Sequence, residues 1–374
     1  MRVIFQIITS INLGGAENIA FSLADYLNTA EGNFKPVIFE LYKTESTYSD
    51  NKKKKLTEQG IEFHTLGLKS KYLSLVIAPF TLWYYIRKRK PEIVHSHTDL
   101  PDFVLALTVK MFSKARFKII RTIHNTELWP THSLLGRITE KSFINDTIIA
   151  VSRPALTAYN NLRKNCRLAS SENQQVILNG IKNPVSSDFP YSLDRTKINI
   201  AFAGRLELQK GADTLLSIIT NCSANIKEKI VFHIIGHGTY QGQIVDFCKK
   251  NSYCIFHEPV SELASKLSSF DYLIMPSRHE GLVLLSLEAS FSKVPVIASD
   301  IPGLAETLPP GWPLLAKAQK PDSFIEILEK ITGEKYNTAE LKAIAFNYVS
   351  QNFSFEKMGR SYLSVFQTLN TGTK

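Results

Sequence analysis

Cysteine is scarce in this chain of 374 residues, which has only four: Cys166, Cys222, Cys248 and Cys254. None of them forms a C-x-x-C pair, and none stands beside a histidine at the spacing of a metal site. The cysteine pattern therefore predicts free thiols in a reducing cytoplasm rather than disulfides or a zinc centre.

Long apolar runs are also missing. The longest mostly apolar run, 72–86, is interrupted by Ser74, Pro79 and Thr81, whereas a helix that spans a bilayer needs about 20 apolar residues. The first fifteen residues, MRVIFQIITSINLGG, contain one basic residue and no small-residue cleavage site. We therefore expect neither a transmembrane segment nor a signal peptide, but a first buried strand followed by a glycine turn.

Acidic residues are outnumbered in one half of the chain. Residues 1–183 contain 25 Lys and Arg against 15 Asp and Glu, whereas residues 184–374 contain 19 of each, so the first half carries the whole net charge of +10. This asymmetry predicts an anionic partner for the first half, which could be nucleic acid, acidic lipid or a phosphate-bearing acceptor.

Runs rich in Val and Ile alternate with stretches of helical length and periodicity. The runs include 3–8, 92–97, 118–124 and 147–152 in the first half, and 198–204, 230–236, 272–277 and 294–299 in the second. Continuous hydrophobicity is typical of strands buried on both faces of a parallel sheet, so the sequence predicts α/β, doubly wound architecture.

The length of the chain suits two domains. A seam rich in Pro, Ser, Asn and Asp at 179–197 separates the two sets of strands. We therefore predict two Rossmann-like domains facing each other across a cleft, 1–183 and 184–352. The tail at 370–374 is expected to fray.

The stretch from Pro276 to Asp300 is the most informative part of the sequence. It predicts a strand, a loop, a helix and a second strand, with Glu280 before the helix and Glu288 on it. The free N–H groups and positive dipole end of a helix N-terminus suit a phosphate. Carboxylates accept hydrogen bonds from sugar hydroxyls. Together these features favour a ligand that contains both phosphate and sugar.

Glycines and cations follow other predicted strands, and ligands of open parallel sheets bind at the carboxyl ends of strands. Gly14 and Gly15 could let backbone amides approach an anion, or could form only a tight strand-to-helix turn. Gly204 is followed by Arg205 and, five residues later, Lys210. These cations could neutralise a diphosphate, or could be a solvated pair at a helix start.

Three histidines lie at the ends of predicted strands in the first half. His95 and His97 are two residues apart and therefore share one face of a strand. No third metal ligand is evident, so structural hydrogen bonding or the lining of an acceptor pocket is preferred to a metal site. His124 and Asn125 follow the next strand; such a histidine could also be an ordinary buried polar residue.

In this order, the motifs resemble those of GT-B fold retaining glycosyltransferases of family GT4. Glu280 and Glu288 match the E-x7-E element, residues 14–17 match G-G-A-E, and Gly236 and Gly238 match a glycine turn of the family. The last pair is not a G-x-G-x-x-G fingerprint. Two departures stand out: many relatives read E-G-F-G-L-P where residues 280–285 read EGLVLL, and the N-G-V-D of the seam is NGIK at 179–182.

The resemblance implies a set of functional residues. The catalytic residues would be His124, Glu280, Arg205 and Lys210. The donor site would comprise Gly14, Gly15, Gly204, Arg205, Lys210, Gly236, Gly238, Glu280, Gly281, Leu282, Val283 and Glu288. The acceptor site would include His95, His97 and Asn125. The base would lie near 254–260, and the C-terminal segment 353–374 would cross back onto the first domain.

The resemblance also implies transfer of a hexose or N-acetylhexosamine, with retention, from a nucleotide-diphosphate sugar, UDP-linked by family frequency. No D-x-D occurs in the chain, so neither a metal nor another cofactor is expected. The acceptor would be a polyprenyl-diphosphate-linked sugar or another glycolipid of bacterial O-antigen, capsule or lipopolysaccharide assembly. The alternatives are a nucleotide-sugar 2-epimerase of the same fold and a basic nucleic-acid-binding protein.

A candidate helix at 72–90 combines aromatic residues with a basic end, RKRK, and further basic residues follow at Lys110, Lys114, Arg116 and Lys118. This combination suits an anionic membrane surface, although a partly buried helix with a solvated basic end is the alternative. We expect a cytoplasmic enzyme bound peripherally to the inner face of the cell membrane through its first domain, without a nucleic-acid partner.

Overall fold

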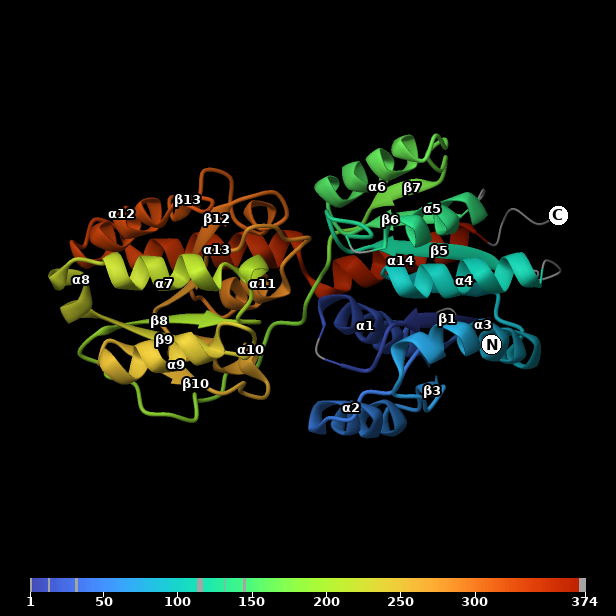
Figure 1. The fold of residues 1–374 in the computed structure, drawn as a ribbon, viewed down its shortest axis with the longest axis horizontal. Coiled ribbons are helices and arrows are strands. Elements are labelled where there is room, and N and C mark those ends of the chain that lie inside the picture. The colour runs from blue at the N-terminus through green and yellow to red at the C-terminus, as the bar shows by residue number, and fades with distance from the viewer. Residues whose placement is uncertain are drawn as a thin grey trace. The chain divides into compact units, whose positions relative to one another are not determined.

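A computed structural model of the protein describes residues 2–12, 14–30, 33–112, 117–130, 132–143 and 146–369. The chain forms two compact units (Figure 1). The first unit comprises Met1–Gly180 together with Phe355–Lys374, and the second comprises Ile181–Ser354. The sequence placed these boundaries at 183/184 and 352/353.

The first unit is built on a parallel sheet of seven strands in the order β3-β2-β1-β4-β5-β6-β7. Its strands are β1 (Arg2–Ile8), β2 (Phe34–Glu40), β3 (Glu62–Thr65), β4 (Ile93–His97), β5 (Lys118–Ile123), β6 (Thr147–Ala150) and β7 (Gln174–Val176). In register, Gln6 of β1 faces His95 of β4, and His97 faces Thr122 of β5. The strand order reverses between β1 and β4.

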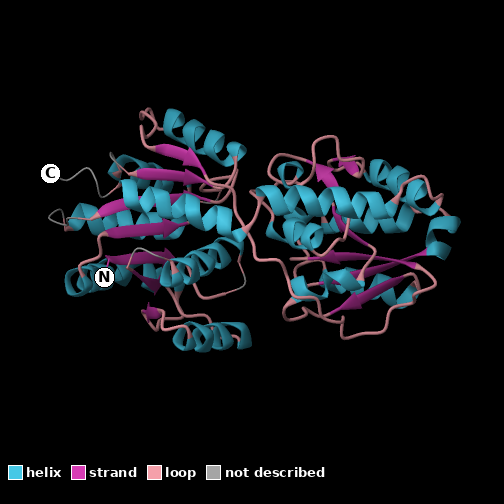
Figure 2. Cartoon of the chain, turned by 180° about the vertical axis from the view of Figure 1, so that it is seen from behind, coloured by secondary structure: helices cyan, strands magenta, loops and turns pink. Residues whose placement is uncertain are grey.

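Helices cover both faces of this sheet (Figure 2). They are α1 (Gly15–Thr29), α2 (Thr47–Glu58), α3 (Lys71–Arg89), α4 (Asp99–Met111), α5 (Ser133–Ser142), α6 (Arg153–Asn165) and α14 (Phe355–Thr368). Phe5 and Ile7 point to the face covered by α3 and α4, whereas Ile8 packs with α1 on the opposite face. This alternation follows from the two-residue period of a strand.

Helix α14 is the part of the chain that returns to the first unit after the second unit is complete (Figure 1). It packs against α1, where Phe355 meets the ring of Tyr26 edge to face. The guanidinium of Arg2 donates to the carbonyl oxygen of Phe366 over 3.0 Å. The predicted return of the C-terminal helix is therefore confirmed.

The second unit repeats the arrangement with six parallel strands in the order β10-β9-β8-β11-β12-β13, reversing between β8 and β11. The strands are β8 (Ile198–Ala203), β9 (Ile230–Ile235), β10 (Cys254–His257), β11 (Tyr272–Met275), β12 (Val296–Asp300) and β13 (Leu315–Lys317). The α-helices are α7 (Ala212–Asn221), α8 (Ala224–Lys229), α9 (Gln241–Lys250), α10 (Leu263–Lys266), α11 (Leu284–Phe291), α12 (Pro321–Thr332) and α13 (Thr338–Asn352). Short 3-10 turns are η1 (Leu208–Lys210), η2 (Leu267–Ser269) and η3 (Ala305–Thr307).

Every apolar run named from the sequence forms a strand, and the strands are almost wholly buried. The predicted α/β, doubly wound architecture is confirmed. The runs named from the sequence do not include β2, β3, β7, β10 or β13. The last four are edge strands of three or four residues, too short to stand out as apolar runs.

A cluster of buried charges joins two helices to the sheet of the first unit. The guanidinium of Arg121 on β5 donates to Asp102 over 3.0 Å, to Glu140 over 2.5 Å and to Asp146 over 3.0 Å. Arg163 donates to the backbone oxygen of Glu140 over 2.6 Å. Buried charges are tolerated when they are paired and hydrogen-bonded in this way, so the cluster fixes α4 and α5 against β5.

Among the described residues, no helix has both the length and the apolar character needed to cross a bilayer. The helix expected at 72–90 is α3, Lys71–Arg89. The basic residues Lys114 and Arg116 and the tail at 370–374 lie outside the described residues.

Candidate active site

The motif residues of the second unit follow the carboxyl ends of its central strands. Gly204 and Arg205 follow β8, and Glu280 follows β11, on the two sides of the point where the strand order reverses. Gly236 and Gly238 follow β9. Open α/β sheets bind ligands at such a reversal point, so these loops form the candidate site of this unit.

Lys210 and Glu280 form an ion pair at the centre of these loops. Lys210 ends the turn η1, Glu280 lies in the loop after β11, and the Lys210 Nζ and Glu280 Oε1 atoms are 2.6 Å apart. The Glu280 side chain is almost fully buried, whereas that of Lys210 is partly open to solvent. The sequence identified both residues but not their contact, which joins positions 70 residues apart.

Arg205 lies on the same scaffold as Lys210. Its guanidinium donates to the Gln209 Oε1 atom over 2.6 Å, and its side chain is exposed. The backbone oxygen of Gln209 accepts from the amide of Arg278 over 2.9 Å, which ties η1 to the loop after β11. The guanidinium of Arg278 in turn pairs with Asp213 on α7. Arg205 is therefore an accessible cation anchored to the loops that hold Glu280.

Two glycines let the loops approach each other backbone to backbone. A Cβ atom at Gly236 would lie 1.9 Å from the Gly204 carbonyl oxygen, so the loops after β8 and β9 could not both keep their positions. Gly303, with φ of +82°, follows β12, and a Cβ there would lie 1.6 Å from the Gly281 carbonyl oxygen. Glycine is required at both places, because any side chain would move the neighbouring loop.

Helix α11 begins immediately after the Glu280 loop. Its N-cap residue, Val283, provides no side-chain cap, so the first amides are available to an anion. Glu288 lies in the second turn, where burial raises the pKa of its carboxyl from 4.5 to about 7. A hydroxyl that donated to this carboxylate would compensate for its lost hydration.

In the first unit, Gly14 caps α1, and Gly15 is its first residue. The side chain of Glu17 folds back over Gly14, because a Cβ there would lie 2.0 Å from the Glu17 Oε2 atom. Burial raises the pKa of this carboxyl above its usual value. The G-G-A-E run thus brings its own carboxyl group to the start of α1, where the sequence predicts an approaching anion.

A row of buried polar side chains runs across the first unit. His97 Nε2 lies 2.6 Å from the Gln6 Oε1 atom, and His97 Nδ1 lies 3.1 Å from His124 Nε2. Burial lowers the pKa of His97 well below 6.5 and that of His124 to about 3. Both rings are therefore neutral at physiological pH.

His95 lies in the same buried layer, beneath α14. Its Nε2 atom is 2.7 Å from the Thr122 Oγ1 atom, and its ring packs against Tyr362 and Phe366. His95 and His97 are both fully buried, whereas Asn125 is exposed. In this structure the two strand histidines form internal hydrogen bonds rather than a surface open to an acceptor. Their predicted acceptor role, like that of Asn125, stays a prediction.

Segment 254–260, expected near the nucleotide base, contains β10 and the loop after it. His257 is buried and hydrogen-bonds through Nε2 to His233 Nδ1 over 3.0 Å, while Glu258 and Pro259 are exposed. The ring of Tyr191 lies 4.8 Å from that of His257. The exposed end of the segment lies at the same edge of the sheet as the other motif loops.

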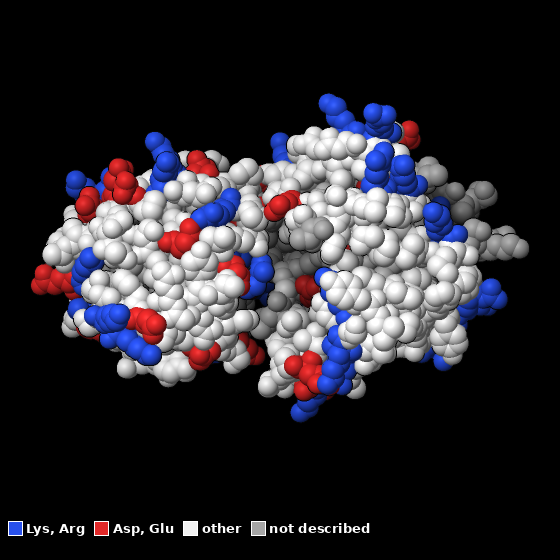
Figure 3. All heavy atoms as spheres, viewed as in Figure 1, with Lys and Arg blue, Asp and Glu red and all other residues white. Residues whose placement is uncertain are grey.

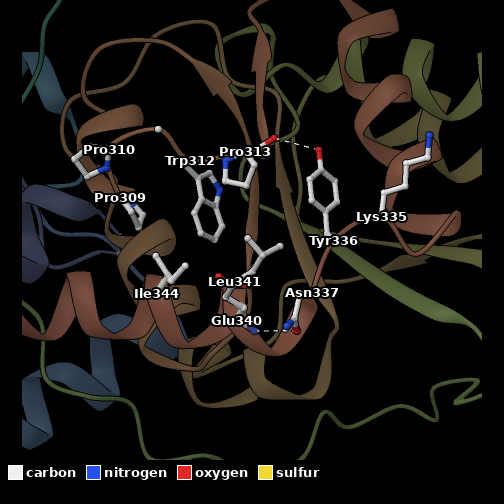
Figure 4. A pocket seen from close by; sticks show the side chains of 11 residues that line it. Pro309, Pro310, Trp312, Pro313, Lys335, Tyr336, Asn337, Glu340, Leu341 and Ile344 are labelled. Carbon is white, nitrogen blue, oxygen red and sulfur yellow. Dashed lines mark hydrogen bonds between the residues drawn. The ribbon is translucent and has the colours of Figure 1, made fainter.

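A separate pocket of about 350 Å³ lies on the second unit (Figure 4). Prolines 309, 310 and 313, Trp312 and Tyr336 line one part of it, and residues of α13 line another. Trp312 donates to the carbonyl of Val296, the first residue of β12, over 2.8 Å. The pocket therefore lies near the amino end of this strand, and it contains none of the candidate site residues.

Several residues of the site region were not found from the sequence. Glu207 accepts from the amide of Thr239 over 3.0 Å and links the loops after β8 and β9. Gly303 stands in a Pro-Gly pair, which predicts a turn. The sequence does not show that this turn contacts Gly281. Gln6 appears in the sequence only as one polar residue inside an apolar run.

Sequence profiles of one enzyme family match both halves of the chain. The sequence profile described as Glycosyltransferase Family 4 matches residues 13–182, and the profile described as Glycosyl transferases group 1 matches residues 197–333. The chain belongs to the group 1, family 4 glycosyltransferases. The predicted resemblance and the enzyme class are thereby confirmed.

Among the relatives of this glycosyltransferase are an uncharacterized 41.2 kDa protein in the cps region of Klebsiella pneumoniae, 27% identical, and the O-antigen biosynthesis glycosyltransferase WclY of Escherichia coli, 26% identical. The alignments cover 76% and 74% of this chain and 80% and 79% of those proteins. The structure of Anabaena HepE in complex with UDP-glucose is similar with a TM-score of 0.78, at 15% identity, over 98% of this chain and 100% of that one. The fold of the glycosyltransferase is GT-B.

We predict that Gly303→Ala destabilises the second unit more than Gly311→Ala does. Both glycines have positive φ, so alanine costs about 1 kcal/mol of backbone strain at either position. A Cβ at Gly311 meets nothing within 4 Å, whereas at Gly303 it adds about 1–3 kcal/mol of steric displacement. Thermal denaturation followed by circular dichroism compares the two variants, and equal midpoints would contradict the proposed loop contact.

We also predict a pH-dependent effect of Glu288→Gln on stability. Between pH 4.5 and 7 the folded protein keeps a proton on Glu288 that the unfolded chain releases. Stability therefore falls as pH rises through this interval, by at most about 3 kcal/mol, and the loss is complete above pH 7. Thermal melts from pH 5 to 8 should show that the melting temperature of Glu288→Gln rises relative to that of the native chain as the pH increases. The exposed Glu326→Gln serves as control, and parallel pH profiles of the native chain and Glu288→Gln would refute the raised pKa.

Proposed function

We propose that this glycosyltransferase transfers a hexose or N-acetylhexosamine, with retention of configuration, from a UDP-sugar to a lipid-linked sugar of bacterial surface polysaccharide. The observation that carries the proposal is the Lys210–Glu280 ion pair, held beside the free start of α11 where the strand order of the second unit reverses. Cations, backbone amides and a carboxylate are thereby close together, as a ligand with a diphosphate and a sugar requires.

In this proposal the ion pair separates when the donor binds. The Lys210 ammonium and the Arg205 guanidinium turn to the diphosphate, while the Glu280 carboxylate accepts hydrogen bonds from hydroxyls of the sugar. Without a donor the two charges neutralise each other, so the buried Glu280 carboxylate has a counter-charge that orients it. Glu288 then accepts from the ribose hydroxyls.

The chemistry follows from where charge develops. As the bond between the anomeric carbon and the diphosphate oxygen breaks, negative charge grows on the diphosphate and positive charge on the sugar ring. Lys210, Arg205 and the first amides of α11 stabilise the leaving diphosphate. The acceptor hydroxyl bonds to the anomeric carbon from the same face, and its proton passes to an oxygen of that diphosphate. We propose that these groups act without a metal ion or other cofactor.

The substrate classes are supported by relatives. HepE is described with UDP and with UDP-glucose bound, which favours a UDP-sugar donor. WclY is described as an enzyme of O-antigen biosynthesis, and the Klebsiella relative is encoded in a cps region. These descriptions favour an acceptor from surface-polysaccharide assembly.

We further propose that α3 attaches the enzyme to an anionic membrane surface, as expected for a cytoplasmic, peripherally bound protein. Its outward face exposes Tyr72, Leu73, Val76, Ile77, Phe80 and Tyr84, and its last turn contains Arg87, Lys88 and Arg89. No acidic residue occurs between positions 63 and 91. Basic side chains also lie along the margins of the first unit (Figure 3). Exposed aromatic and aliphatic groups beside a basic cluster fit an interface of acidic lipid headgroups.

Glu280→Gln and Lys210→Ala should each lower sugar transfer by about two to three orders of magnitude, because each removes a charge that acts on the reacting groups. Both proteins should keep the native circular dichroism spectrum. Lys249→Ala is the matched control, since it breaks a Lys–carboxylate pair on α9 in the same unit. Release of UDP from a panel of UDP-sugars with a lipid-linked acceptor measures the effect.

Near-native rates in both site variants would contradict the assignment of Glu280 and Lys210. Conversion of a donor into an isomer when no acceptor is present would instead indicate an epimerase. A strict requirement for a divalent cation would contradict the metal-independent mechanism.

Val76→Glu should weaken binding to vesicles of anionic phospholipid about tenfold. The substitution replaces apolar contact of the exposed Val76 with the lipid by a negative charge that the anionic headgroups repel. Val185→Glu introduces the same charge at an exposed valine of the second unit and should have little effect. Vesicle sedimentation at two salt concentrations measures both. Equal binding of the two variants, or binding that is indifferent to anionic lipid, would refute attachment through α3.

A further inference from the structure

The polar row of the first unit consists of three side chains that are hydrogen-bonded one to the next across adjacent strands. Gln6 lies on β1, His97 ends β4, and His124 follows β5, and these strands are neighbours in the sheet. Gln6 Oε1 is 2.6 Å from His97 Nε2, and His97 Nδ1 is 3.1 Å from His124 Nε2. The Gln6 and His97 side chains are fully buried, whereas His124 is 8% exposed.

Burial restricts the protonation states of this row. It lowers the pKa of His97 well below 6.5 and that of His124 to about 3. Each ring is therefore neutral at pH 7, with one N–H that donates and one bare nitrogen that accepts.

The amide oxygen of Gln6 then sets the direction of every hydrogen bond. An oxygen can only accept, so His97 Nε2 carries the proton and donates to Gln6. His97 Nδ1 is consequently bare and accepts from His124 Nε2. His124 Nδ1 is left bare in turn, and no side chain in the described part of the chain donates to it.

We propose that Gln6 and His97 are positioning residues that fix His124 in the tautomer with a proton on Nε2 and a lone pair on Nδ1. This proposal rests on the proposed function and on the catalytic role that the family resemblance implies for His124, which we take to be contact with the transferred sugar. The lone pair accepts a hydrogen bond from a hydroxyl or an N–H group of the sugar. A carbonyl or carboxylate oxygen at the same place would be repelled, because its lone pairs would face the lone pair of His124 Nδ1. The row therefore also selects for a sugar group that donates a hydrogen bond.

A second hydrogen bond in the same buried layer provides a control for the Gln6 substitution. His95 and Thr122 form a second hydrogen bond in the same buried layer, 2.7 Å long, which continues to the hydroxyl of Tyr362 over 3.3 Å. Thr122→Val breaks this branch without removing a hydrogen-bonding atom of Gln6, His97 or His124. Gln6→Met removes the accepting oxygen with little change of side-chain length. Both variants disturb the same layer, but only Gln6→Met frees the tautomer of His124.

Nitrogen NMR of the full chain labelled with 15N-histidine reports which ring nitrogen of His124 is protonated, and the spectrum of His124→Gln identifies the resonances. The native chain should show His124 protonated on Nε2 alone, Gln6→Met should show a mixture of tautomers, and Thr122→Val should match the native chain. The ratio kcat/KM for sugar transfer should fall about tenfold in Gln6→Met, the order of one lost hydrogen bond, and less than twofold in Thr122→Val.

A native His124 protonated on Nδ1, or one whose tautomer is unchanged in Gln6→Met, would overturn the proposal. A shifted tautomer with unchanged kcat/KM would overturn its role in transfer. The native spectrum requires no substitution and no activity, so it tests the tautomer even if Gln6→Met does not fold. A fixed tautomer in a protein that transfers no sugar would overturn the proposed function instead.

Discussion

Direct contact between backbones is the constraint on which the candidate site of the second unit depends. The loops after β8 and β9 touch at Gly204 and Gly236, and the loops after β11 and β12 touch at Gly281 and Gly303. Gly211, next to Lys210, lies against the Pro276 carbonyl at the start of the Glu280 loop, where a Cβ would be 2.0 Å from that oxygen. Because main chains in contact leave little room for adjustment, Lys210 and Glu280 are held 2.6 Å apart although 70 residues separate them in sequence. The positions of these two charges are thus set by the main chain, which is the kind of rigid support that electrostatic catalysis requires.

In the first unit, hydrogen bonds and ion pairs between side chains hold the polar residues in place. One face of its sheet has the row from Gln6 to His124, and strand alternation puts Arg121 with its three carboxylates on the other. Hydrogen-bonded buried polar groups favour one arrangement, because a shift would break these bonds where no water can replace them. The first unit is therefore ordered by hydrogen-bond directions, whereas the candidate site of the second unit is ordered by steric contact.

The sequence predicts the elements better than their contacts. Runs such as 198–204 and 272–277 are continuous and apolar, and both form the expected buried strands. The E-x7-E, Arg205 and Lys210 motifs could be found because each is local in sequence. Gly303 and Gln6 could not, because their importance comes from Gly281 and His97, which are distant in sequence. His95 shows another limit: its strand-end position left open structural hydrogen bonding or the lining of an acceptor pocket, and the sequence could not show that α14, more than 250 residues later, covers it.

The return of α14 explains why polar residues are tolerated in the centre of the first sheet. Tyr362 brings a hydroxyl within 3.3 Å of Thr122, and the rings of Tyr362 and Phe366 close over His95. Without this helix, His95 and Thr122 would lose the side chains that cover them, and water would compete for the hydrogen bond between them. Burial lowers the pKa of His95 to about 3, and the rings of Tyr362 and Phe366 belong to the layer that buries it. The segment that completes the first unit therefore also helps to keep His95 neutral, next to the ring of His97.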